Sequence, residues 1–151
     1  MIYKGNAISV ARSDDNIATL TFDLQGESVN KLSSAVIKEL GEAVKALNAE
    51  HGLNGLIIAS GKEAFIVGAD ITEFHQLFDK GQDYLVEMNL KVHDIFNAIE
   101  DLPFPTVTAI NGLALGGGCE VLLTTDFRVM SEKAKIGLPE TKLGIIPGWG
   151  G

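Results

Sequence analysis

The sequence contains a single cysteine, Cys119, so no disulfide bond can form within the chain. One free thiol is typical of a reducing compartment, and on this basis we expect a cytoplasmic protein. The first five residues lack the charged and then apolar pattern of a secretory signal peptide. We therefore expect no targeting segment at this end.

Positive charge is scarce, with 12 Lys and Arg residues against 20 Asp and Glu residues and a formal net charge of −8. A field of this sign argues against nucleic acid or an anionic membrane surface as a general partner. It does not exclude a small ligand that carries phosphate, because a few local cations or helix N-termini are enough to bind one.

Metal and nucleotide motifs are also missing. His51, His75 and His93 lack the spacing of metal ligands, so we expect them on helix surfaces and predict no metal site. Cys119 has no histidine near it in the sequence and is interpreted as a small packing residue. The glycine triplet at 116–118 begins neither a P-loop nor a dinucleotide-binding fingerprint.

Residues 107–125 are apolar enough to raise the question of a membrane span. Asn111, Glu120 and three consecutive glycines lie inside this stretch, and a charged group there is costly in a bilayer. We therefore interpret the stretch as buried core with a functional loop, and expect no integral membrane segment.

The chain has 151 residues, of which 46% are hydrophobic, and this suits one domain or most of one. Hydrophobic periodicity predicts short strands that alternate with amphipathic helices. The expected strands span residues 8–10, 17–22, 56–59, 106–110, 127–130 and 134–137, and the expected helices span residues 33–50, 83–100 and 117–124, with a short helix from residue 70. This order predicts a mixed α/β fold with several parallel crossovers.

Three of these elements carry finer expectations. Ser33 is expected to cap the first helix, and residues 56–59 are expected to form a strand covered on both faces. The inner face of the first helix is predicted to be Val36, Leu40, Ala43, Val44 and Leu47, and that of the helix at 83–100 to be Leu85, Met88, Val92, Ile95, Phe96 and Ile99.

A glycine-rich turn, Gly116-Gly117-Gly118, leads into the short helix that contains Glu120. Such a turn leaves backbone N–H groups free to stabilise an oxyanion, although a tight packing turn is the simpler explanation of the triplet alone. Glu120 precedes an apolar run, and burial would shift the pKa of its carboxyl toward a range useful in acid–base catalysis. A surface glutamate favoured by the helix macrodipole is the open alternative.

A second acid, Glu140, follows Pro139 just beyond an expected strand. Two acids entering one pocket from separate elements could add water across a polarised double bond. The spacing alone leaves open whether they meet. The turn Gly68-Ala69-Asp70 also offers backbone N–H groups before a helix, but a structural N-cap is the simpler interpretation of Asp70.

Four blocks occur in a recognisable order. They are residues 28–32 (Ser-Val-Asn-Lys-Leu), 64–70 (Ala-Phe-Ile-Val-Gly-Ala-Asp), 111–120 (Asn-Gly-Leu-Ala-Leu-Gly-Gly-Gly-Cys-Glu) and 137–148, which begins Gly-Leu-Pro-Glu and ends Leu-Gly-Ile-Ile-Pro-Gly. Together they resemble the crotonase, or enoyl-CoA hydratase/isomerase, superfamily over nearly the whole chain. The resemblance implies a crotonase-like spiral of ββα units, here lacking its C-terminal side.

The resemblance also implies a site and a reaction. Glu120 and Glu140 would be the catalytic glutamates, and the N–H groups of Ala69 and Gly117 would form an oxyanion hole for a thioester carbonyl. The implied substrate is an acyl-CoA, and the implied reactions are hydration of 2-enoyl-CoA, which needs no cofactor, and Δ3-Δ2-enoyl-CoA isomerisation at the same site.

Coenzyme A is expected to bind at Lys31, Lys62, Gly68 and Asp70, a placement that also comes from the resemblance. Other members of the family are dehalogenases, thioester hydrolases and decarboxylases, but glutamate at both positions favours hydration. An inert acyl-CoA-binding or interaction fragment is the alternative from another class.

Residues 1–5 and 65–74 most resemble multifunctional members of the family that also carry a 3-hydroxyacyl-CoA dehydrogenase. The chain ends in a glycine-rich turn, so we expect residues 1–151 to be the N-terminal part of a hydratase/isomerase domain in a longer protein. NAD would then bind only in the dehydrogenase part, which lies outside these residues. A thiolase β subunit would be the partner of the full-length protein.

Overall fold

A twisted six-stranded sheet forms one layer of the structure, a computed structural model that describes residues 1–151. Its spatial order is β1 (Tyr3–Lys4), β2 (Ile8–Arg12), β3 (Ile17–Phe22), β4 (Gly55–Ser60), β5 (Thr106–Ile110) and β7 (Phe127–Met130). The first three strands pair antiparallel, whereas β3, β4, β5 and β7 pair parallel. The mixed α/β order with parallel crossovers is therefore confirmed.

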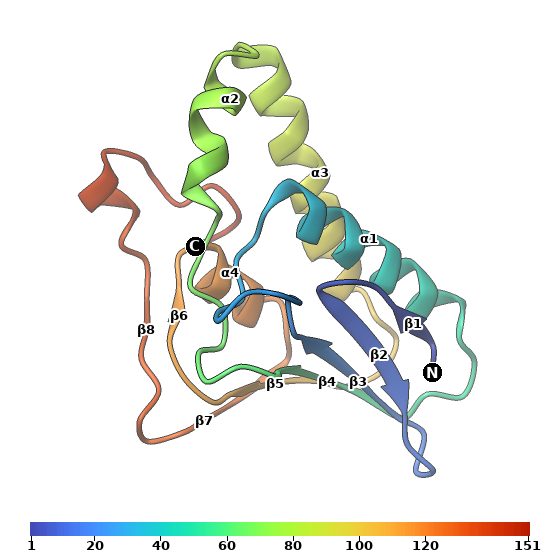
Figure 1. Cartoon of the computed structure of the whole chain (residues 1–151). Helices are drawn as coiled ribbons and strands as arrows, with labels where there is room; N and C mark the ends of the chain where they lie inside the picture. The colour runs from blue at the N-terminus through green and yellow to red at the C-terminus, as the bar shows by residue number, and fades with distance from the viewer.

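The helices connect the parallel strands and lie above the sheet (Figure 1). They are α1 (Ser34–Ala49), α2 (Phe74–Phe78), α3 (Gln82–Glu100) and α4 (Gly117–Leu123), with 3₁₀ turns η1 (Ile71–Glu73) and η2 (Glu140–Leu143). A separate pair of short parallel strands, β6 (Ala114–Leu115) and β8 (Ile136–Gly137), stands beside α4. None of the helices is both long and apolar enough to cross a membrane.

Helix α1 forms as its sequence predicts. The Ser33 hydroxyl accepts a hydrogen bond from the Val36 N–H at 3.3 Å and so caps the first turn. The buried residues of α1 are the predicted ones, Val36, Leu40, Ala43, Val44 and Leu47. They face the sheet across the hydrophobic core, which confirms the amphipathic interpretation of this segment.

Helix α3 is buried only along its second half, which differs from the prediction. Val92, Phe96 and Ile99 are buried, whereas Leu85 and Met88 are half-buried. The cause is that the first half of α3 extends beyond the sheet together with α2 (Figure 1). There its apolar side chains line a cavity instead of the closed core.

The expectation that β4 is covered on both faces was wrong. Leu56 and Ile58 are buried beneath the helices, but Ile57, on the opposite face, is only half-buried. Residues of β5 alternate in the same way, and all four residues of β7 are exposed. A continuous apolar run therefore did not distinguish two covered faces from one.

Residues 107–125 form most of β5, then β6 and all of α4. Ile110, Ala114, Val121 and Leu122 are buried there, and Glu120 is buried with them. The interpretation of this stretch as protein core is confirmed, whereas the functional role expected of its loop stays a prediction.

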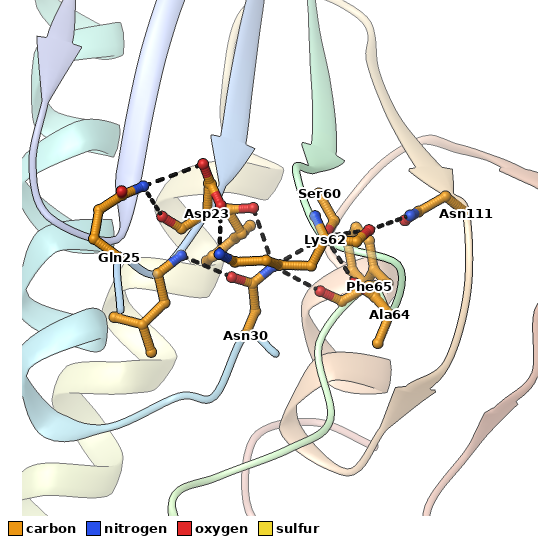
Figure 2. A network of polar contacts seen from close by, with 10 residues as sticks. Asp23, Gln25, Asn30, Ser60, Lys62, Ala64, Phe65 and Asn111 are labelled. Atoms are coloured by element: carbon orange, nitrogen blue, oxygen red, sulfur yellow. Dashed lines mark hydrogen bonds and ion pairs between the residues drawn. The ribbon is translucent and has the colours of Figure 1, made fainter. Parts of the chain in front are cut away.

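Asn30 joins three loops at the carboxyl ends of β3 and β4 (Figure 2). Its Nδ2 lies 3.0 Å from the Phe22 carbonyl, 3.0 Å from the Phe65 carbonyl and 2.9 Å from the Ser60 hydroxyl. Its Oδ1 accepts from the Leu24 N–H at 3.0 Å. Only 2% of the residue is exposed, so these groups have no access to water if the amide is removed.

Replacement of Asn30 by Ala is expected to lower the free energy of unfolding by about 3 kcal/mol, because the Phe65 carbonyl and the Leu24 N–H lose their partner. Urea denaturation followed by circular dichroism measures the change. Asn48→Ala, at an exposed position of α1, is the matched control and should change stability by less than about 0.5 kcal/mol. Equal losses in the two variants would contradict this role.

Candidate active site

A cavity of about 640 Å³ lies between the first half of α3, the start of α4 and the chain that follows β8. Its wall is mainly apolar and includes Leu77, Leu85 and Met88. Two carboxylates also line it, Glu120 and Glu140. Their exposed fractions are 3% and 9%, so two buried acids from separate elements share one apolar cavity.

Glu120 lies in the first turn of α4, where the two following residues fix the helix in the core. Its Oε1 accepts hydrogen bonds from the Trp149 N–H at 2.7 Å and from the Gly151 N–H at 3.1 Å. Burial raises the pKa of this carboxyl above its usual value, and the two N–H donors oppose that rise. The charge of Glu140 raises the pKa further, whereas His93 lowers it.

Glu140 opens η2 directly after Pro139. Its Oε2 is buried and has no hydrogen-bond partner, and it is the single side-chain atom of the chain in that condition. Its Oε1 approaches Gly116 so closely that a Cβ at residue 116 would lie 2.9 Å away. A buried carboxyl oxygen without a partner is costly and is characteristic of functional sites.

The segments that carry the two candidate oxyanion donors, Ala69 and Gly117, run parallel and in contact. Ile66 and Ala114 form a parallel bridge, and the Leu115 N–H donates to the Ile66 carbonyl at 3.0 Å. Ala69 and Gly117 each follow this bridge by three residues and both line the cavity. Neither of their N–H groups donates to another group of the chain, so both can bind a carbonyl oxygen.

The residues expected to bind coenzyme A are not gathered in this cavity. Gly68 lines it, but Lys31 and Lys62 do not. Lys31 Nζ lies 3.6 Å from an oxygen of Asp70, and Lys62 Nζ lies 2.8 Å from Asp23 (Figure 2). Both ammonium groups are therefore paired with carboxylates of the chain itself.

Asp70 caps η1 as its sequence predicts. Its Oδ1 accepts from the Thr72 N–H at 3.1 Å and from the Thr72 hydroxyl at 2.7 Å. These two hydrogen bonds lower the pKa of the Asp70 carboxyl, and Lys31 lowers it further. The structural cap, which was the simpler interpretation, is confirmed.

Three residues of the site were missed from the sequence: Asn89, His93 and Trp149. His93 was expected on a helix surface but is half-buried, and its Nε2 lies 2.7 Å from the Gly148 carbonyl. Trp149 Nε1 donates to Asn89 Oδ1 at 2.8 Å. A polar residue among the apolar positions of α3 was the available signal for Asn89, but nothing local pairs it with a residue 60 positions away.

Cys119 is buried, as expected of a packing residue, and burial raises the pKa of its thiol. His75 is exposed on α2, as expected, whereas His51 is exposed but lies in the loop after α1 and not on a helix. The chain contains no group of three or more His, Cys, Asp or Glu side chains arranged to hold a metal ion.

Comparison with known sequences identifies a family and close relatives. The enoyl-CoA hydratase/isomerase family model matches residues 12–151. The fatty acid oxidation complex subunit alpha of Acinetobacter baumannii strain AYE and that of Pseudomonas putida strain GB-1 are each 56% identical over 151 residues. These alignments cover 100% of this chain but only 21% of each relative.

Solved structures give the same answer for the fold. An enoyl-CoA hydratase from Bacillus anthracis superposes with a TM-score of 0.83 at 33% identity, covering 95% of this chain and 55% of that one. An enoyl-CoA hydratase/carnithine racemase from Magnetospirillum magneticum superposes with a TM-score of 0.87 at 26% identity, covering 96% and 54%. The crotonase-like α/β fold is therefore confirmed.

Gly118→Ala is expected to destabilise the protein by about 3 kcal/mol, because the new Cβ would overlap the Ile66 carbonyl oxygen and force α4 away from residues 66–69. Gly137→Ala is the matched control, since its Cβ would make an ordinary 3.7 Å contact with Leu115. Urea denaturation compares them. If Gly118→Ala is as stable as Gly137→Ala, close backbone approach does not govern this region.

Proposed function

Because this chain belongs to the enoyl-CoA hydratase/isomerase family, we propose that it carries the active site of an enoyl-CoA hydratase. The reaction is addition of water across the double bond of 2-enoyl-CoA in fatty-acid β-oxidation. One observation carries the proposal: two buried glutamates and two unpaired N–H groups line a single apolar cavity. Hydration of a conjugated thioester needs this combination of acid–base groups and carbonyl polarisation.

The N–H groups of Ala69 and Gly117 act on the thioester carbonyl. Hydrogen bonds from both draw electron density from the double bond and stabilise the enolate that forms as water adds. Loss of one such donor typically costs roughly 3 kcal/mol of transition-state stabilisation.

Glu120 acts as the base and Glu140 as the acid. Two N–H donors favour the ionised form of Glu120, while burial makes it a stronger base than an exposed carboxylate. Water gives a proton to Glu120 and its oxygen bonds to the β-carbon. The π electrons move to the α-carbon, which takes a proton from Glu140. Proton return from Glu120 to Glu140 resets the pair.

The same site supports isomerisation of 3-enoyl-CoA to 2-enoyl-CoA. A carboxylate beside the oxyanion hole removes a proton from the α-carbon and returns it to the γ-carbon, so no water is consumed. The unpartnered Oε2 of Glu140 favours this second activity, because that oxygen is free to exchange a proton with carbon.

The whole protein is a multifunctional, cytoplasmic enzyme of which residues 1–151 form the N-terminal part of the hydratase/isomerase domain. Support comes from the 56% identical relatives, which are alpha subunits of fatty acid oxidation complexes and which this chain spans for 21% of their length. In this proposal a 3-hydroxyacyl-CoA dehydrogenase part binds NAD, and a thiolase β subunit is the partner. Hydration itself needs no cofactor.

Replacement of Glu120 or Glu140 by Gln is expected to lower kcat by on the order of 100-fold or more, with a smaller change in KM. Gln keeps the shape of the side chain but cannot exchange a proton. The assay follows loss of the conjugated-thioester absorbance of a short 2-enoyl-CoA, using the longest natural chain that contains these residues. Glu132→Gln, at an exposed position, is the control and should keep full activity.

The same assay separates hydration from the alternative of an inert acyl-CoA-binding fragment. An unaltered protein that binds 2-enoyl-CoA without turnover would support the inert fragment. Activity that survives in both Gln variants would exclude the paired-glutamate mechanism.

Lys31 and Lys62 are proposed to bind the phosphates of coenzyme A, after exchanging their present carboxylate partners for the ligand. The double variant Lys31→Ala/Lys62→Ala is expected to weaken CoA binding at least about tenfold and to flatten its salt dependence. Calorimetric titration at several salt concentrations measures both. Lys45→Ala, exposed on α1, is the control; unchanged affinity and salt dependence in the double variant would remove this placement.

A further inference from the structure

We propose that Asn89 of α3 is a positioning residue that holds the Glu120 carboxylate in place through the peptide bond between Gly148 and Trp149. The inference deepens the proposed hydratase function, because it identifies what orients the base of that reaction. Asn89 and Glu120 lie on different helices, and the Gly148–Trp149 peptide links them.

Both polar atoms of the Asn89 side-chain amide form hydrogen bonds with residues 148 and 149. Its Oδ1 accepts from the Trp149 indole N–H at 2.8 Å, and its Nδ2 donates to the Gly148 carbonyl at 3.3 Å. His93, one turn further along α3, donates to the same carbonyl from Nε2 at 2.7 Å. Phe96 adds an edge-on contact with the Trp149 ring, with 6.1 Å between ring centroids.

Because the peptide unit is planar, fixing its carbonyl also fixes the direction of its N–H toward the Glu120 carboxylate. The carbonyl of Gly148 and the N–H of Trp149 belong to one planar peptide unit, and in the trans form they point in opposite directions. Asn89 and His93 fix the carbonyl end of the unit. The N–H end is thereby aimed at Glu120 Oε1, which it meets at 2.7 Å.

The hydrogen bonds of Asn89 also position the Trp149 indole over the glycine turn of α4. A Cβ on Gly117 would lie only 2.6 Å from Trp149 Cζ3, so the indole rests directly on that glycine. The Asn89 side chain lines the cavity, but its carbonyl oxygen and amide nitrogen are already engaged with residues 148 and 149. Its role therefore runs through these residues and not through contact with substrate.

Several titratable groups near Glu120 interact electrostatically with its carboxyl. They are Glu140 from η2, Cys119 from α4 and His93 from α3. The N–H of Trp149 favours the ionised carboxylate, so loss of this hydrogen bond raises the pKa of Glu120. A base with a raised pKa stays protonated to higher pH, and the acidic limb of the pH–rate profile then moves upward.

The experiment compares Asn89→Ala and Trp149→Phe with Asn97→Ala, which removes an exposed asparagine from the same helix. Hydration of a short 2-enoyl-CoA is measured from pH 5 to 9 in the longest natural chain that contains these residues. Asn89→Ala is expected to lower kcat about tenfold at neutral pH, to change KM by less than about twofold and to move the acidic limb to higher pH. Trp149→Phe keeps the packing ring and should show a smaller shift in the same direction.

A second readout does not depend on turnover. The ¹³C resonance of the Glu120 carboxyl, assigned with the Glu120→Gln variant, is followed as a function of pH in each variant. The midpoint of this titration should move to higher pH in Asn89→Ala but not in Asn97→Ala. An unaltered protein without hydratase activity would end the proposed function, while this titration still decides the role of Asn89. Identical Glu120 titrations in Asn89→Ala and the unaltered protein, or a raised KM with an unchanged pH profile, would overturn the inference.

Discussion

The site depends on the close approach of two backbone segments, residues 65–69 and the glycine turn that opens α4. The bridge between Ile66 and Ala114 sets their register, and Gly118 lies against the Ile66 carbonyl where any side chain would collide. This contact holds together the two segments that carry Ala69 and Gly117, and both residues line the cavity. Glycine is required for a steric reason, and the chemistry proposed for the cavity follows from that steric requirement.

Burying two carboxyl groups in an apolar cavity costs desolvation free energy, and the two groups differ in how many hydrogen bonds offset that cost. Glu120 receives two backbone N–H donors, which offset part of the cost of burying its charge. Glu140 keeps one buried oxygen with no partner. Burial of both acids fits the proton-transfer roles proposed for them, because such roles favour carboxyls with shifted pKa values.

Residues 148 and 149 connect the two helices that form opposite parts of the cavity wall, α3 and α4. The peptide group between them spans the distance from α3 to Glu120, and the indole ring of Trp149 covers Gly117. The first half of α3 extends beyond the closed core, and its apolar side chains line the cavity. One helix therefore contributes to the core with one half and to the site with the other.

Local pattern in the sequence was enough to determine most of the elements, although it did not predict the two-residue strands β1 and β6. The cap at Ser33, the buried face of α1 and the cap at Asp70 follow from periodicity and hydrogen-bonding capacity within a few residues. The two glutamates and the two candidate oxyanion donors were identified from motifs, and the fold class came with them.

Only the tertiary structure decided which distant groups meet. It paired Asn89 with Trp149, turned His93 inward, engaged Lys31 and Lys62 with carboxylates, and left the far face of the sheet half-covered. The physical reason is range. Strand alternation, helix amphipathicity and capping act between near neighbours in the chain, whereas these contacts join segments that only the packed sheet and helices bring within hydrogen-bonding distance.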